Sequence, residues 1–261
     1  MLAFDFGSGR AGASFADLVE LLAGDVPVLE VMPPDELDDV DRPSSVDARL
    51  RLLTGEIAAN GFEVAVVIGY CAGAALAQSV SVLLGAARQP APHVVLVDPE
   101  TVDRMTLLQA YETSLASLQS MDRSRAGELT RPPGWTPNDR DLVQDARLLL
   151  DSYVTTVAAA FARMRLPAKL GVQLGARFHR YLAYLVMSGL SRSFPAARPE
   201  ILASSGYVQD ALFPGELRRL DVNRDGMLAS PAVAEAVRRA VEAHESTPRP
   251  VATVGTGDGR C

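Results

Sequence analysis

The sequence predicts an α/β protein with a mostly parallel sheet flanked by helices. Apolar, strand-like runs occupy residues 2–6, 64–68 and 94–97. Between them lie residues 14–22 and 45–59, where apolar side chains recur at helical spacing. Strands that alternate with helices of about a dozen residues are typical of parallel sheets with right-handed crossovers.

The remaining elements of this core each have a local signal. Ser14 is a suitable N-cap for the helix over 14–22, and Pro231 suits the first turn of a final helix. The acidic residues 35–41 are expected to form a solvated loop. The other expected elements are strands over 28–32, 200–204 and 217–222 and helices over 72–84 and 230–244.

The middle of the chain departs from this alternation. From residue 105 to residue 190 the pattern is helical, with long stretches over 139–163 and 170–188 and breaks at prolines such as Pro167. We interpret this part as a helical lid inserted into the sheet domain. The predicted organisation is a first core part at 1–104, a lid at 105–195, a second core part at 196–246 and a flexible tail at 247–261.

Composition limits the class of protein. The 261 residues are 48% hydrophobic, which is enough for one substantial core. No apolar run reaches the roughly 20 residues of a membrane span, and the start carries no secretion signal, so a cytoplasmic location is expected. The net charge of -7 opposes nucleic-acid binding. With only Cys71 and Cys261, a disulfide framework is excluded.

The most informative motif is Gly69-Tyr70-Cys71-Ala72-Gly73, which lies between an apolar strand and a helix. A Gly-x-nucleophile-x-Gly turn in this context is the nucleophile elbow of α/β-hydrolases, here with Cys in place of the usual Ser. Because Cys71 precedes a helix N-terminus, its pKa is expected to lie below the ordinary thiol value. The alternative is a turn of small residues with an inert buried Cys.

In the order of its parts, the chain resembles the thioesterase family of polyketide and nonribosomal peptide pathways, whose members are α/β-hydrolases with a helical lid. Three stretches carry the resemblance: the opening strand and glycine-rich loop at 4–9 followed by 13–15, the elbow at 69–73, and the strand Val94-Val95-Leu96-Val97-Asp98. The likeness is weak across the lid.

The resemblance implies a role for each matching residue. Cys71 would be the nucleophile and Asp98 the acidic member of a triad. The backbone N–H of Ala72, with that of Phe6 or Gly7, would form the oxyanion hole that stabilises charge on the thioester oxygen. Asp98 has a second interpretation, because Asp before Pro at the end of a strand is also a common turn residue.

The general base of the family is a histidine that precedes the last helix, and this chain has Arg224 at that position. Since a thiol ionises far more readily than a hydroxyl, the Cys and Arg departures are expected to be linked, with Arg224 stabilising a thiolate or an oxyanion. His179 in the lid is the one candidate for a substitute base, and it is alternatively a packing residue. His93 is expected at the surface, and His244 is expected at the end of the last helix.

The sequence offers no cofactor motif, and none is expected. Asp221 to Gly226 matches the first half of an EF-hand loop, but the twelfth position is Ala232 rather than Glu, so we treat the match as coincidence. Aromatic residues of the lid are either acyl-channel lining or simple packing residues, namely Trp135, Phe161, Phe178, Tyr181 and Tyr184.

The function expected from the resemblance is acyl hydrolysis or acyl transfer from a carrier-protein or coenzyme A thioester, through an acyl group held on Cys71. Two alternatives stay open. The first is a noncatalytic relative that binds an acyl carrier or a partner enzyme. The second is an enzyme similar to dienelactone hydrolases, which also use a Gly-x-Cys-x-Gly elbow but need a downstream His.

Overall fold

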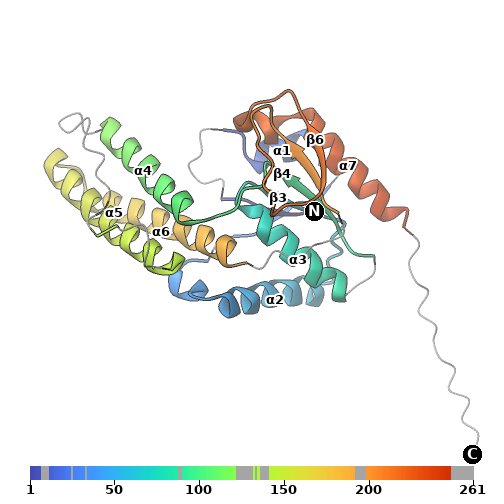
Figure 1. Ribbon diagram of the computed structural model, residues 1–261, viewed down its shortest axis with the longest axis horizontal. Coiled ribbons are helices and arrows are strands. Elements are labelled where there is room, and N and C mark those ends of the chain that lie inside the picture. The colour runs from blue at the N-terminus through green and yellow to red at the C-terminus, as the bar shows by residue number, and fades with distance from the viewer. Residues whose placement is uncertain are drawn as a thin grey trace, which may run out of the picture.

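The described residues form a six-stranded sheet that is parallel throughout and has the strand order β2-β1-β3-β4-β5-β6. Helices surround its central strands β3 and β4 (Figure 1). The computed structural model describes residues 1–6, 12–24, 26–32, 34–87, 90–121, 132, 134–135, 141–191 and 198–247. The strands are β1 (Leu2–Phe4), β2 (Leu29–Glu30), β3 (Val66–Tyr70), β4 (His93–Val97), β5 (Glu200–Ala203) and β6 (Glu216–Arg219).

Helices cover both faces of the sheet because alternate strand residues point to opposite sides. Val67 and Leu96 pack on one side with helices α2 (Pro43–Ala59) and α3 (Gly73–Ala87). Ile68 and Val95 pack on the other side with α1 (Phe15–Leu21) and α7 (Pro231–Glu245). The predicted fold class is therefore confirmed, including the strand, tight turn and helix at β3 and α3 that define the α/β-hydrolase arrangement.

The acidic residues 35–41 differ from the prediction of a solvated loop. They contain the short 3-10 helix η1 (Leu37–Val40), in which Leu37 and Val40 are buried. The two apolar side chains pack into the core, while Asp38 stays largely exposed and pairs with Arg147. The many acidic residues of the segment suggested a solvated loop, although the apolar residues Leu37 and Val40 are three positions apart, as a short helix requires.

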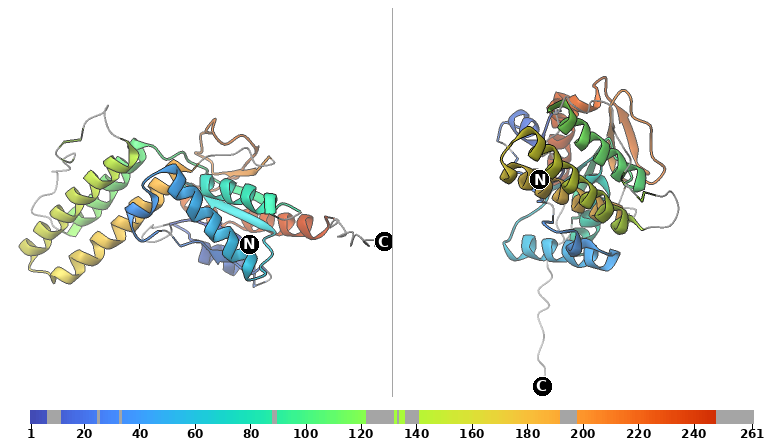
Figure 2. Two further views of the ribbon diagram at one scale, coloured as in Figure 1. Left: turned by 90° about the horizontal axis from the view of Figure 1, so that it is seen from below. Right: turned by 90° about the vertical axis from the view of Figure 1, so that its left-hand side faces the viewer.

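In the described residues between β4 and β5 lie three long helices: α4 (Arg104–Met121), α5 (Leu142–Met164) and α6 (Ala168–Leu190). We call them the helical segment, and they extend away from the sheet on one side of the molecule (Figure 2). The Asp141 side chain accepts a hydrogen bond from the Gln144 N–H, so α5 begins after this cap. None of the described helices combines the length and apolar character that a membrane crossing requires.

Polar contacts fix the helical segment to itself and to the sheet domain. Arg104 of α4 pairs with Asp145 of α5, whose side chain is only 1% exposed. Near the end of α6, the Ser188 hydroxyl donates to the carbonyl of Ala72. Ser191 lies 2.7 Å from the Ser79 hydroxyl of α3. The end of α6 is therefore attached beside the turn that follows β3.

That turn requires glycine at two positions because strand and helix pass very close to each other. A Cβ atom on Gly69 would lie 2.7 Å from the Ala74 Cα, and one on Gly73 would lie 2.2 Å from the Phe4 carbonyl oxygen. Both distances are far below normal van der Waals contact. By contrast, a Cβ atom on Gly55 in α2 would meet nothing within 4 Å.

We predict that alanine has opposite effects on stability at Gly73 and at Gly55. Gly73→Ala is expected to lower the free energy of unfolding by about 1 to 3 kcal/mol, because the Phe4 backbone has to move. Gly55→Ala is expected to raise it by about 0.5 to 1 kcal/mol through helix propensity. Urea unfolding followed by circular dichroism measures both, and an unchanged stability of Gly73→Ala would contradict the close approach.

Candidate active site

Cys71 occupies the turn between β3 and α3 in a strained backbone conformation, with a φ of +54°. Its N–H donates to the Val97 carbonyl at 2.9 Å, and its carbonyl accepts from the N–H groups of Ala74 at 3.1 Å and Glu100 at 3.2 Å. These bonds hold a left-handed conformation that a non-glycine residue rarely adopts. The side chain is thereby aimed away from the sheet at the carboxyl ends of the strands.

Two charged side chains meet the Cys71 sulfur. The thiol donates to Glu100 Oε2 at 3.1 Å, and the Arg224 guanidinium donates to Sγ at 2.7 Å. Arg224 also pairs directly with Glu100 Oε2. Glu100 follows β4, whereas Arg224 begins the 3-10 helix η3 (Arg224–Ala229). We call Cys71, Glu100 and Arg224 the thiol cluster.

The expectation of a lowered thiol pKa is wrong. Burial, and then the negative charge of Glu100, raise the pKa of Cys71 to about 12. The charge of Arg224 and the hydrogen bond from the Ala72 N–H act in the opposite direction but do not outweigh them. The sequence indicates the two features that lower this pKa, the helix N-terminus and Arg224, but not the two that raise it, desolvation and Glu100. At neutral pH the resting Cys71 is therefore a protonated thiol.

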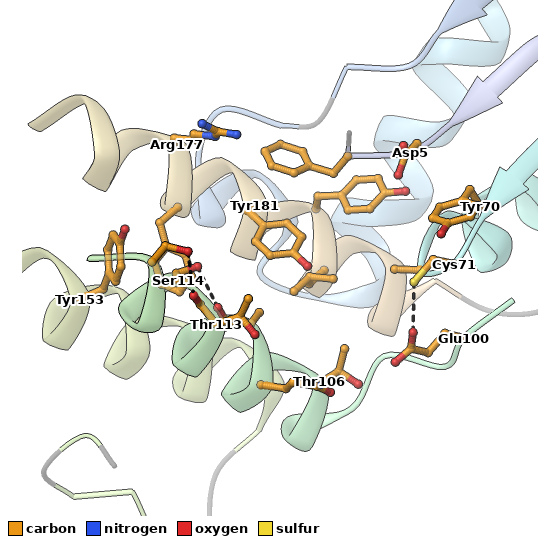
Figure 3. A pocket seen from close by; sticks show the side chains of 18 of the residues that line it. Asp5, Tyr70, Cys71, Glu100, Thr106, Thr113, Ser114, Tyr153, Arg177 and Tyr181 are labelled. Carbon is orange, nitrogen blue, oxygen red and sulfur yellow. Dashed lines mark hydrogen bonds between the residues drawn. The ribbon is translucent and has the colours of Figure 1, made fainter. Parts of the chain in front are cut away.

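A pocket of about 520 Å³ opens from the thiol cluster and runs between α4 and α6 (Figure 3). At the Cys71 end it is lined by Phe6, Tyr70 and Tyr181, and the rings of Phe6 and Tyr181 stack 5.0 Å apart. Burial, followed by the charges of Cys71 and Glu100, raises the pKa of Tyr181 to about 12, so this phenol remains protonated. The other walls include Thr106, Gln109, Ser114 and Ser117 of α4 and Leu174, Phe178 and Leu185 of α6.

Asp98 lies at the end of β4, with a φ of +43° and 2% of its surface exposed. One carboxylate oxygen, Oδ1, accepts from the Ser204 N–H at 2.7 Å, and the other, Oδ2, is buried without a hydrogen-bond partner in the described structure. Asp98 is not among the residues that line the pocket. The carboxylate in contact with the sulfur is Glu100, two residues further along the chain.

The structure does not bring His179 to Cys71. Its Nε2 accepts from the Leu37 N–H at 3.1 Å, and its Nδ1 lies 3.5 Å from Glu36. The side chain therefore connects α6 to η1, outside the residues that line the pocket. His93 is exposed, as expected, and His244 lies in the last turn of α7, as expected, where it is buried near His93 with the two rings 6.3 Å apart.

The backbone groups expected at the oxyanion hole are placed in part. Ala72 and Phe6 both line the pocket, whereas Gly7 lies outside the described residues. The half EF-hand match has a local explanation, because the Asn223 side chain accepts from the Gly226 N–H at 2.9 Å and caps η3. Within the described ranges, no three His, Cys, Asp or Glu side chains are grouped as metal ligands.

Comparison with known proteins gives only distant likenesses. No family model and no curated protein matches the chain. A four-domain nonribosomal peptide synthetase bound to AMP and glycine has a TM-score of 0.48 at 16% identity, and the match covers 95% of this chain but 19% of the synthetase. A covalent complex of the NocB thioesterase domain with a fluorophosphonate nocardicin G analogue has a TM-score of 0.48 at 13% identity and covers 92% of each chain.

The RedJ thioesterase of the prodiginine pathway in Streptomyces coelicolor has a TM-score of 0.43 at 15% identity, and the match covers 92% of this chain and 88% of that chain. None of these TM-scores reaches 0.5, so we draw no conclusion about activity from the likenesses. The function has to be inferred from the thiol cluster and its pocket.

The raised pKa predicts slow alkylation of Cys71. At pH 8 iodoacetamide is expected to modify Cys71 more slowly than Cys261, and the Cys71 rate is expected to keep rising up to pH 10, because thiolate forms only toward pH 12. Glu100→Gln removes the neighbouring negative charge and should speed the reaction. Peptide mass spectrometry resolves the two cysteines. A midpoint at or below the ordinary value of about 8.5 would contradict the electrostatics described here.

Proposed function

We propose that the protein is a thioesterase-like acyl hydrolase or acyltransferase that takes an acyl group from a thioester onto Cys71. The observation that supports this most directly is the thiol cluster, in which a strained Cys71 donates its proton toward Glu100 at the head of a pocket. The expected donors are carrier-protein or coenzyme A thioesters, as the resemblance in sequence implies. The helical segment would then serve as the lid over the acyl chain.

Glu100 is the group placed to remove the thiol proton. As Sγ attacks the thioester carbon, the proton passes to Glu100 Oε2, which is 3.1 Å away in the resting state. The tetrahedral intermediate then collapses, the bond to the leaving sulfur breaks, and Glu100 returns the proton to that sulfur. In hydrolysis, Glu100 next takes a proton from water, whose oxygen attacks the Cys71 acyl group, and the proton returns to Sγ.

Arg224 supplies a fixed positive charge to this sequence. A guanidinium does not act as a base, but it contacts both the sulfur and the Glu100 carboxylate. It therefore stabilises negative charge on whichever of the two atoms carries it. Ala72 and Phe6 line the same end of the pocket, and their N–H groups are the proposed donors to the carbonyl oxygen as charge develops there.

The second candidate is a noncatalytic protein that binds acyl groups or a carrier in the same pocket. The high pKa of Cys71 favours this alternative, since a protonated thiol is a poor nucleophile. The distinction depends on whether Glu100 removes the proton during attack, which can be measured.

The Glu100 mechanism predicts opposite effects on two reactions of one sulfur. Glu100→Gln is expected to speed alkylation of Cys71, because the pKa falls, and to slow formation of the acyl-enzyme about 100-fold or more, because the base is lost. Intact-protein mass spectrometry with an N-acetylcysteamine thioester measures the acyl-enzyme, and Cys71→Ala should give none. Glu56→Gln, an exposed change in α2, is the matched control.

If Glu100→Gln speeds both reactions, Glu100 is not the base. If the unaltered protein forms no acyl adduct with any thioester while Cys71 can still be alkylated, the noncatalytic alternative becomes the better account.

Asp98 and the position of Arg224 give a separate prediction. The side chain at position 224 reaches the nucleophile, and Asp98 Oδ2 is buried without a partner in the described structure. Cys71→Ser is expected to be inactive because a carboxylate such as that of Glu100 is too weak a base to activate a hydroxyl. Adding Arg224→His should restore thioester hydrolysis by about tenfold or more over adding Arg224→Gln, with Asp98 orienting the imidazole.

A steady-state assay of thiol release measures this rescue. The third change Asp98→Asn should remove the rescued activity if Asp98 accepts from the imidazole. Equal rates for the Arg224→His and Arg224→Gln combinations would show that position 224 is not equivalent to the histidine position of the family.

A further inference from the structure

The end of the pocket remote from Cys71 is lined by a cation and several hydroxyl groups. It is formed by Tyr153 of α5, Arg177 and Phe178 of α6, and hydroxyl residues of α4 such as Ser114. Figure 3 shows Cys71 and Glu100 at one end of the pocket and Tyr153 and Arg177 at the other. A ligand bonded to Cys71 would therefore point its far end toward Tyr153 and Arg177. We call these two residues the distal pair.

Among the described residues, the half-buried cation Arg177 has no counter-ion. Within the part of the chain that the structure describes, its guanidinium makes no ion pair and no hydrogen bond. The carboxylates that line the pocket all lie at the Cys71 end. Asp5 follows β1, Glu100 follows β4, and Asp225 is next to Arg224 in the chain. A partly desolvated cation without a partner is stabilised by an anion that enters with a ligand.

Tyr153 adds a second donor at the same place. Its side chain is 5% exposed and its ring packs on Phe178, with ring centres 4.2 Å apart, so its orientation is fixed. The hydroxyl makes no hydrogen bond within the described residues and interacts electrostatically with Arg177. Burial raises the pKa of Tyr153, which keeps the phenol protonated as a donor. A carboxylate that enters this end of the pocket therefore meets two donor side chains.

We propose that the distal pair binds a carboxylate at the far end of the acyl chain, so that the substrates are thioesters of dicarboxylic acids bound through their free acid. The proposal rests on the proposed function for its thioester and on the distal pair for its carboxylate. Tyr181 lies near Cys71, and Arg177 is one helical turn further, about 6 Å along α6. The acyl chain has to cover this separation and the gaps left by the Cys71 and Arg177 side chains, for which an extended chain of about six to ten carbon atoms is long enough.

The first experiment measures binding without chemistry. Suberic acid monoamide and its methyl ester carry no thioester group, and they differ at the distal end by the charge and one methyl group. Calorimetry at low salt is expected to show that the acid binds about tenfold more tightly. Because the chain has a net charge of -7, a general attraction for anions does not explain such a preference.

Substitutions locate the preference. Arg177→Met should abolish it, Arg177→Lys should keep part of it, and Tyr153→Phe should weaken it. Arg180→Met is the matched control, because it removes the same charge from an exposed position of the same helix that does not line the pocket. Equal binding of acid and ester by the unaltered protein, or equal effects of the Arg177→Met and Arg180→Met changes, would overturn the proposal.

The second experiment separates this inference from the proposed function. The N-acetylcysteamine thioester of suberic acid should acylate Cys71 about tenfold faster than the thioester of its monomethyl ester, and Arg177→Met should equalise the two rates. If both acylate equally fast, the carboxylate preference fails while the proposed function stands. If neither acylates but the acid still binds through Arg177, the proposed function fails and the anion site stands.

Discussion

The close crossing of β3 and α3 is the constraint on which the site depends. There is no space for a side chain at Gly69 or Gly73, since the Phe4 backbone passes directly against the start of α3. At this crossing Cys71 has a positive φ, its N–H donates to the Val97 carbonyl of β4, and its carbonyl accepts from the Glu100 N–H just after β4. The same bonds bring Glu100 to the sulfur, so the elbow positions both the proposed nucleophile and the neighbouring carboxylate.

The thiol cluster differs from a Ser-His-Asp triad in how its charge is arranged. With the thiol protonated, Glu100 and Arg224 form an ion pair, and their charges cancel next to a neutral sulfur. Moving the proton from Cys71 to Glu100 leaves one negative and one positive charge in the cluster, so its net charge does not change. The cost of burying charge therefore changes little during the proton transfer, which is the physical argument for a base other than imidazole here.

Much of the fold could be predicted from local patterns, because buried strands, helix caps and the glycine spacing of the elbow each depend on residues that are close together in the sequence. Ser14 and Pro231 stand at helix starts as expected, and Arg224 reaches the predicted nucleophile. Glu100 was missed because a carboxylate after a strand has no distinctive sequence signal. The pKa of Cys71 was predicted with the wrong sign because desolvation depends on packing by distant helices, which no local pattern records.

The hydrogen bond from Ser188 to the Ala72 carbonyl makes the two walls of the pocket unequal. Ala72 follows the nucleophile directly, so any shift of the end of α6 would pull on the backbone that positions Cys71. In α4, Arg104 pairs with Asp145 of α5. The α6 wall of the pocket is thus bonded to the backbone beside Cys71, whereas Arg104 of the α4 wall is bonded to α5, so we expect changes that alter the width of the bound ligand to accumulate on α4.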